Sequence, residues 1–322
     1  MSLAHHNYHY VSNGAGWQLE LKQCRPPQTI NEKKNPLLII PGYGMNSFIF
    51  GYHPHGLSME EYLTQRGFEV WSLNLRAHGG SIREKGGHDR FTLKDLALVD
   101  LKIALDYMVK NVSSKTGKID LLGCSLGGTI AYIYAALSPR NHCGSIVSMG
   151  TPMRWEDVHP LVKLAFLSPK LVGCIRVAYT KELIRLLFPF IVNSPFLKIY
   201  LHKEMVDLRN QNILLESVEN PNRYINKEIA EWVKKKDLFI NGKNLTQELK
   251  KIKNPLLCIV ANSDGVVPAM TALSAHEVIG SKIKETLVVG TDNLRFAHAD
   301  LFVSNHCHEM VFKPVAEWLA NH

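Results

Sequence analysis

One serine in this sequence has the neighbours that a catalytic nucleophile requires. Residues 123–127 read Gly-Cys-Ser-Leu-Gly, with Ser125 at the centre, after the apolar run Ile119–Gly123 and before the apolar run Leu126–Leu137. This order predicts a strand, a tight turn and a helix. The turn strains the serine backbone, and the helix start directs unpaired N–H groups at a developing oxyanion. We therefore interpret Ser125 as a nucleophile; the alternative is a tight turn that only happens to contain serine.

The sequence around this serine resembles the alpha/beta-hydrolase family, and the resemblance extends over nearly all of the core. Residues 38–44, Leu-Ile-Ile-Pro-Gly-Tyr-Gly, resemble the family's first oxyanion loop, with Pro41 where the family often has histidine. The resemblance implies that the backbone amides of Tyr43 and Leu126 form the oxyanion hole. Because these donors are backbone groups, the change at position 41 should be tolerated.

The family order of serine, then acid, then histidine selects the remaining members of a triad. A serine hydroxyl needs a base to take its proton and an acid to orient that base. Asp264 follows the apolar run Leu256–Ala261 and resembles the family's acid, although an aspartate before glycine also suits an Asx turn. His298 follows the run Thr286–Val289 and resembles the family's base.

Other acidic and histidine residues near the C-terminus are weaker candidates. Asp292 follows the wrong strand for the acid, and Asp300 is expected to cap or fix a loop. His306 and His308 are interpreted as cap or surface positions. Their His-Cys-His spacing could suit a metal, but no second cluster with ligand spacing occurs, so no metal is predicted. His5, His6 and His9 are expected to be disordered or at the surface.

The elements that must position these residues follow from apolar periodicity. Helices are predicted at Leu126–Leu137, at Met310–Leu319 and at Leu93–Val109, the last with a capping box from Thr92 and Asp95. Short apolar runs bounded by Gly, Pro, Asn or Asp predict strands at Leu37–Ile40, Val70–Leu75, Ile119–Gly123, Ser145–Met149, Leu256–Ala261 and Thr286–Val289. This alternation predicts an α/β protein with a mostly parallel, twisted sheet flanked by helices, as the resemblance also implies.

A further segment, residues 73–81, resembles the D-x-R-G-x-G-x-S stretch of the same family, which is structural there. Asn74 and Ala77 depart from it. The resemblance supports the alpha/beta-hydrolase fold rather than the mechanism.

The regular alternation stops after Gly150, and about one hundred residues pass before the next clear strand. We predict a core of 1–151 and 251–322 with a helical lid inserted at 152–250. The lid carries more than half of the chain's net charge of +8. Its apolar runs are Leu161–Phe166, Leu183–Ile191 and Phe196–Tyr200. These runs could simply pack on the core, or they could form an acyl pocket beside a basic, lipid-facing surface.

Composition excludes several other classes of protein. Of the 322 residues, 46% are hydrophobic and 20% charged, as in an ordinary folded enzyme. The sequence contains no basic cluster with interleaved aromatic residues, which is the pattern that would indicate nucleic-acid binding. No signal peptide or membrane-spanning run is evident. We expect a cytoplasmic protein with reduced thiols at Cys24, Cys124, Cys143, Cys174, Cys258 and Cys307.

The sequence therefore predicts a serine hydrolase that cleaves carboxylic esters, including lipid or acyl esters, without a cofactor. An acyltransferase is the first alternative, because the resemblance includes polyhydroxyalkanoate synthase-like members. Those synthases use cysteine where this chain has Ser125, which favours hydrolysis. A non-catalytic binding module on the same fold is the second alternative. The natural substrate and the oligomeric state stay open.

Overall fold

A computed structural model describes residues 5–26, 32–166, 182–183, 186–187, 190, 192 and 194–322. Its main feature is a nine-stranded sheet, whose path runs β1-β2-β4-β3-β6-β7-β10-β11 with β5 paired to β2. These strands are β1 (His5–Ser12), β2 (Trp17–Arg25), β3 (Leu37–Ile40), β4 (Val70–Asn74), β5 (Ile82–Arg83), β6 (Ile119–Cys124), β7 (Cys143–Met149), β10 (Leu256–Ala261) and β11 (Lys284–Val289).

The six strands from β4 to β11 along this path pair in parallel, whereas β2 is antiparallel to both β1 and β4. All six predicted strands are present, with bounds that differ by two residues at most. The sequence did not predict β1, β2 and β5. The first two form a long hairpin whose outer strand is too polar to give an apolar signal.

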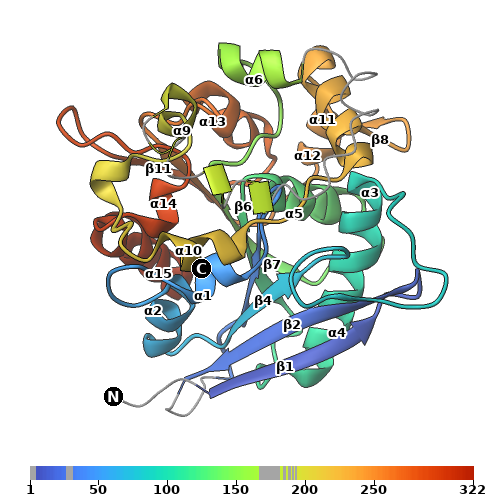
Figure 1. Cartoon of the computed structure of the whole chain (residues 1–322). Coiled ribbons are helices and arrows are strands. Elements are labelled where there is room, and N and C mark those ends of the chain that lie inside the picture. Colours follow the sequence, from blue (N-terminus) through green and yellow to red (C-terminus); the bar gives the residue numbers. More distant parts are fainter. Residues whose placement is uncertain are drawn as a thin grey trace.

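Helices cover both faces of this sheet, with α1, α2 and α15 on one side and α3, α4 and α5 on the other (Figure 1). The helices of the core are α1 (Phe48–Gly51), α2 (Met59–Gln65), α3 (Leu93–Asp95), α4 (Lys102–Asn111), α5 (Leu126–Leu137), α13 (Ala269–Val278), α14 (Asp300–Val303) and α15 (Lys313–Asn321). Two π-helical turns, η1 (Leu96–Leu101) and η4 (His308–Phe312), continue into α4 and α15. The predicted fold class is therefore correct.

Each buried strand supplies side chains to two separate hydrophobic cores. In β3, Leu38 and Ile40 enter the core with α5, and Leu37 and Ile39 enter the core with α1 and α2. This division follows from the two-residue period of a strand. Because both faces are covered, the whole of β3 is apolar rather than alternating.

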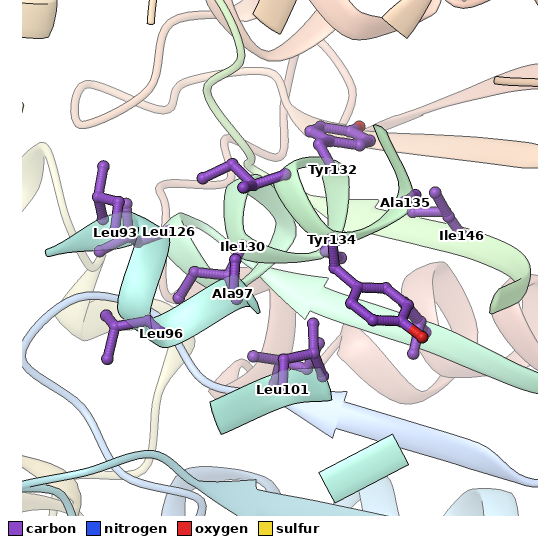
Figure 2. Packing of buried hydrophobic residues seen from close by; sticks show 14 of the residues in the cluster. Leu93, Leu96, Ala97, Leu101, Leu126, Ile130, Tyr132, Tyr134, Ala135 and Ile146 are labelled. Carbon is purple, nitrogen blue, oxygen red and sulfur yellow. The ribbon is translucent and has the colours of Figure 1, made fainter. Parts of the chain in front are cut away.

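The helix that follows Ser125 is held firmly by the first of these cores. Figure 2 shows Ala97 and Leu101 of η1 beside Ile130 and Tyr134 of α5, and all four side chains are buried. The helical run of α3, η1 and α4 begins with the predicted capping box. The Thr92 side chain accepts from the backbone amide of Asp95, and the Asp95 side chain accepts from the backbone amide of Thr92. The strand, turn and helix around the candidate nucleophile are thus part of a rigid interior.

The segment between β7 and β10 contains several short helices, described only in part. They are α6 (Pro160–Ala165), α9 (Pro195–Lys198), η2 (Lys203–Met205), α10 (Gln211–Leu214), η3 (Leu215–Ser217), α11 (Arg223–Lys235) and α12 (Leu245–Leu249), with a hairpin of β8 (Phe239–Ile240) and β9 (Lys243–Asn244). Of the three apolar runs noted in this segment of the sequence, Leu161–Phe166 overlaps α6 and Phe196–Tyr200 overlaps α9. The third, Leu183–Ile191, lies largely outside the described residues. Since α12 packs beside α5 and α13, the helical layer of the core resumes before residue 251.

Of the two alternatives expected for the N-terminal histidines, disorder is wrong, whereas His6 is a surface residue as the second alternative has it. His5 and His6 lie in β1, which pairs with β2 along its whole length. His9 packs its ring 4.8 Å from that of Trp71 and bonds the hydroxyl of Tyr107 through Nδ1 at 3.0 Å. The order of this segment was not predicted, because the pairing with β2 that creates it depends on residues outside the local sequence.

The family segment at residues 73–81 has a structural role here. Arg76 makes a buried ion pair with Asp100 of η1, in which Nε lies 2.8 Å from the carboxylate. Asn74 accepts from the backbone of Ser47 and thereby ties the loop after β3 to β4. Ala77 has φ +60°, a conformation that glycine adopts without strain. This departure from the family pattern is therefore accommodated at an energetic cost.

The described cysteines are all buried and free: Cys24, Cys124, Cys143, Cys258 and Cys307. Cys174 lies outside the described residues. Among the described residues, no helix is long and apolar enough to cross a membrane.

Candidate active site

The candidate site lies at the carboxyl edge of the sheet, where ligands commonly bind in open α/β sheets. Ile40, the last residue of β3, pairs in register with Gly123 of β6. The predicted oxyanion loop and the Ser125 turn therefore leave the sheet side by side. At the same edge, Asp264 follows β10 and His298 follows β11.

Ser125 occupies a strained turn between β6 and α5. Its φ and ψ angles are +51° and −122°, and its amide donates to the carbonyl of Met149 at 2.8 Å. A Cβ at Gly123 would lie 2.3 Å from the backbone of α5, and a Cβ at Gly127 would lie 2.2 Å from the carbonyl oxygen of Ile40. Only glycine fits at either position, so the two glycines of the motif allow this close approach.

Asp264 and His298 form a buried pair. Nδ1 of His298 lies 2.6 Å from Oδ2 of Asp264, and the two side chains are only 5% and 1% exposed. The other carboxylate oxygen accepts from the amides of Val266 and Val267, each at 2.8 Å. Asp264 is therefore an Asx-turn residue and a histidine partner at once, and Nε2 of His298 stays available as a proton acceptor.

The histidine ring stands beside the end of β7, next to the strand that bears the serine. A Cβ added at Gly150 would lie 3.0 Å from Nδ1 and from Cε1 of His298, so the ring packs directly on this glycine. The preceding residue, Met149, accepts the Ser125 amide. One short stretch of backbone thus contacts both the candidate nucleophile and the candidate base.

The predicted oxyanion loop packs against the nucleophile turn. A Cβ at Gly42 would lie 3.1 Å from the Cβ of Ser125. Tyr43 and Leu126 line the same cavity as Ser125, and Leu126 is the first residue of α5, where amides lack helical partners. The phenol of Tyr43 donates a hydrogen bond to Oδ1 of Asn226 on α11.

An apolar cavity of about 340 Å³ opens at Ser125. Its size is within the range of small-molecule sites. The indole rings of Trp155 and Trp232 meet edge to face at 5.7 Å in its wall. Residues from the core and from the inserted segment share the remaining lining, including Leu161, Val162, Phe166, Ile199, Ile229, Val266 and Val267.

The segment between β7 and β10 holds both the acid loop and the histidine loop. The amide of Gly265 donates to the carbonyl of Ile199 at 3.1 Å, and the amide of Ala299 donates to the carbonyl of Tyr200 at 2.7 Å. The hydrogen bonds of this clamp join main-chain atoms, so they do not restrict the residue types of Ile199 and Tyr200. The close approach does restrict position 265, where a Cβ would lie 2.5 Å from the Cβ of Ile199. Sequence reasoning had no pattern that linked this glycine to residue 199.

Asp300 fixes the same histidine loop, as the sequence predicted. Its buried carboxylate accepts from the backbone of Ala297 at 2.7 Å and bonds Nδ1 of His202 at 2.8 Å. Burial raises the pKa of Asp300, and these bonds oppose that shift. Asp292, the rival acid, is exposed and lies apart from this network.

His308, which the sequence suggested as a cap or surface position, begins η4 and is half-buried. Its ligand atoms and those of His53 and Cys307 lie within 4.8 Å of one another. However, Nδ1 of His53 accepts the amide of His55 at 3.0 Å, so the ring proton resides on Nε2, the atom nearest Cys307. A metal bound at Nε2 would displace this proton, and the proton could not move to Nδ1 because Nδ1 already accepts a hydrogen bond. The three residues are therefore better described as a hydrogen-bonded cluster. His306 is exposed, as expected.

Comparison with known proteins identifies the family. A family model described as alpha/beta hydrolase fold matches residues 35–290, from β3 to the end of β11. The chain belongs to the alpha/beta hydrolase fold family. This alpha/beta hydrolase is also 22% identical over 315 aligned residues to the poly(3-hydroxyalkanoate) polymerase subunit PhaC of Haloferax mediterranei. The match covers 88% of the chain but only 58% of that polymerase subunit.

Solved structures share the fold of this alpha/beta hydrolase at low identity. A soluble variant of monoglyceride lipase from Saccharomyces cerevisiae is 15% identical, with a TM-score of 0.67 and coverage of 100% of this chain and 96% of that one. The monoacylglycerol lipase of Paleococcus ferrophilus is 17% identical, with a TM-score of 0.56 and coverage of 94% and 99%. At these identities the likeness establishes the fold alone.

Proposed function

We propose that this alpha/beta hydrolase is a serine hydrolase that cleaves carboxylic esters through Ser125, His298 and Asp264. The observation that carries the proposal is the buried pair of His298 and Asp264 beside a strained serine that opens on an apolar cavity. Strain at a serine, a buried histidine with a fixed tautomer and an apolar cavity open at the surface of the core are each costly. Their occurrence at one edge of the sheet is typical of a catalytic site.

In the acylation half of the reaction, Nε2 of His298 takes the hydroxyl proton as Ser125 Oγ attacks the ester carbonyl. The carbonyl oxygen becomes an oxyanion, which the amides of Tyr43 and Leu126 stabilise. Asp264 stabilises the imidazolium through Nδ1. When the tetrahedral intermediate collapses, the C–O bond to the alcohol breaks and His298 returns the proton to the departing oxygen.

In the deacylation half, water takes the place of the alcohol. His298 removes a proton from the water, and the hydroxide attacks the acyl carbonyl on Ser125. Collapse of the second intermediate releases the carboxylic acid and returns the proton to Oγ. No metal, redox group or other cofactor takes part in this sequence of steps.

Labelling with a fluorophosphonate probe tests the proposal directly, because such probes phosphonylate an activated serine. Wild-type protein should label and the Ser125→Ala variant should not. A folded wild type that neither labels nor hydrolyses simple esters would instead favour a binding module on the same fold.

The cavity leads us to propose that the acyl group is a medium or long alkyl chain. Each buried methylene contributes roughly 0.8 kcal/mol, so kcat/KM should rise about fourfold per carbon, or about fifteenfold per two carbons, until the cavity is full. A series of p-nitrophenyl esters from acetyl to palmitoyl measures this. A strong preference for acetyl would overturn the acyl-pocket assignment while leaving the triad in place. Ile229→Trp, which fills the cavity, should shift the preference toward short chains.

We further propose that the inserted segment contacts a lipid surface. Leu164, Leu186 and Phe190 are 64%, 71% and 78% exposed, and Lys163 is exposed beside the first of them. Exposed apolar side chains with a nearby cation suit an anionic interface. Sedimentation with phosphatidylserine-containing vesicles should retain more protein than with neutral vesicles. Equal absence from both pellets would rule the contact out.

An acyltransferase is the second candidate, because the relative from Haloferax mediterranei is named as a polymerase subunit. The nearest thiol does not support a cysteine nucleophile. Cys124 is buried against Met149, with 3.9 Å between the sulfur atoms, and burial raises its pKa. Product analysis with and without an added alcohol separates the two: ester formation at the expense of free acid would favour transfer.

A further inference from the structure

Helix α11 contributes to the apolar cavity and also contacts the oxyanion loop. Ile229 and Trp232 line the cavity, and Asn226, one turn earlier, accepts the phenol proton of Tyr43. The three positions are spaced three residues apart and so lie along one face of the helix. The hydrogen bond joins residues 183 positions apart in the chain.

Tyr43 has a main-chain tie at its neighbour, since the carbonyl of Gly44 accepts from the amide of Glu219 at 2.8 Å. It lies between Gly42 and Gly44, and Gly44 has φ +65°. Glycine on both sides gives this backbone a wider range of allowed angles than other residues would. The amide of Tyr43 must point at the substrate rather than bond the protein, so it cannot anchor the loop. The phenol is the group that joins this residue to α11.

The partners of this hydrogen bond are suited to a persistent contact. Asn226 is only 7% exposed, and burial raises the pKa of Tyr43, so its hydroxyl stays a donor at all ordinary pH values. Breaking the bond would leave two buried polar groups unpaired, which is unfavourable.

Helix α11 is itself fixed to the core and can therefore serve as a reference point. The carboxylate of Glu228 accepts the amide of Leu93 at 2.7 Å, at the start of α3. The side chain of Asn222 caps α11 by accepting from the amide of Tyr224 at 2.9 Å. Helix α11 is thus held in place at the core, and its hydrogen bond to Tyr43 connects this fixed helix to the oxyanion loop.

We propose that Asn226 is a positioning residue for the oxyanion hole: through the phenol of Tyr43 it holds the Tyr43 amide in the direction that the transition state requires. This inference rests on the proposed serine-hydrolase function. Because the oxyanion forms only after attack, loss of the contact should act on the transition state and leave ground-state binding of the acyl chain unchanged.

Kinetics of Tyr43→Phe, Asn226→Leu and the double variant test the inference. We expect kcat for a medium-chain ester to fall about tenfold in each single variant, with KM within twofold of wild type. The double variant should also fall about tenfold, because both substitutions remove the same bond. A boronic acid that forms a tetrahedral adduct with Ser125 should bind about tenfold more weakly, whereas an uncleavable ether analogue should bind as before.

Two matched variants separate positioning from general damage. Asn226→Asp keeps an acceptor oxygen and should retain most of kcat, and Lys227→Gln, exposed on the same helix, should behave as wild type. If Asn226→Leu fails to fold, Tyr43→Phe, which removes a single hydroxyl, carries the test. Full kcat in Tyr43→Phe, or a change confined to KM, would overturn the inference alone. A wild type without labelling or ester hydrolysis would overturn the proposed function and the inference together.

Discussion

Replacing Ser125 by alanine is expected to lower kcat for a p-nitrophenyl ester by about 10⁵- to 10⁶-fold, because no other group can form the acyl-enzyme. The strained backbone and the apolar cavity do not depend on the hydroxyl, so substrate binding should persist. Steady-state and single-turnover kinetics measure the two effects separately.

Ser138→Ala is the matched control for this variant. Ser138 caps the far end of the same helix, α5, away from the cavity, and its loss should leave kcat within twofold. Residual activity above about one per cent in Ser125→Ala, with purity verified, would mean that another residue is the nucleophile.

The second large effect is expected from Asp264→Asn, which should lower kcat about 10⁴-fold with little change in KM. The amide can still accept from Val266 and Val267, so the turn is preserved. However, it would present an NH2 group to Nδ1 of His298, or force the ring into the tautomer that cannot accept the serine proton. The pH profile of kcat/KM should show the change most clearly, because the base is altered and the nucleophile is not.

Asp292→Asn provides the control, since Asp292 is exposed on the loop that follows β11. It should keep wild-type kinetics. Activity lost in Asp292→Asn and kept in Asp264→Asn would transfer the role of the acid to the rival residue and require the histidine loop to rearrange.

The local parts of this architecture were predictable because their signals are local. The bounds of β3, β10 and α5 agree with prediction to the residue, since each is a run of mostly apolar residues, bounded by proline or asparagine in the two strands and by serine in the helix. The turn at Ser125 was predicted from Gly123 and Gly127, because their spacing around the serine alone indicates a turn that requires glycine. By contrast, β1 was missed, because its alternating histidines and tyrosines become a strand only when paired with β2.

The long-range parts of the candidate site could not be predicted. The family order selects Asp264 and His298 from among many acids and histidines, but no pattern links Asn226 to Tyr43 or His202 to Asp300. Such contacts depend on how the inserted segment folds over the sheet. The grouping of His53 with Cys307 is a similar case, because 254 residues separate the two.

The main-chain clamp from Ile199 and Tyr200 has a consequence for protein engineering. The inserted segment looks like a part that could be cut out or exchanged for that of a relative, as is often done to change substrate range. Yet it supplies the acceptors for the amides of Gly265 and Ala299, which follow the acid and the histidine directly. A minimal version without it would expose those amides and free both loops. Successful exchange should therefore keep residues 199–202 as part of the recipient.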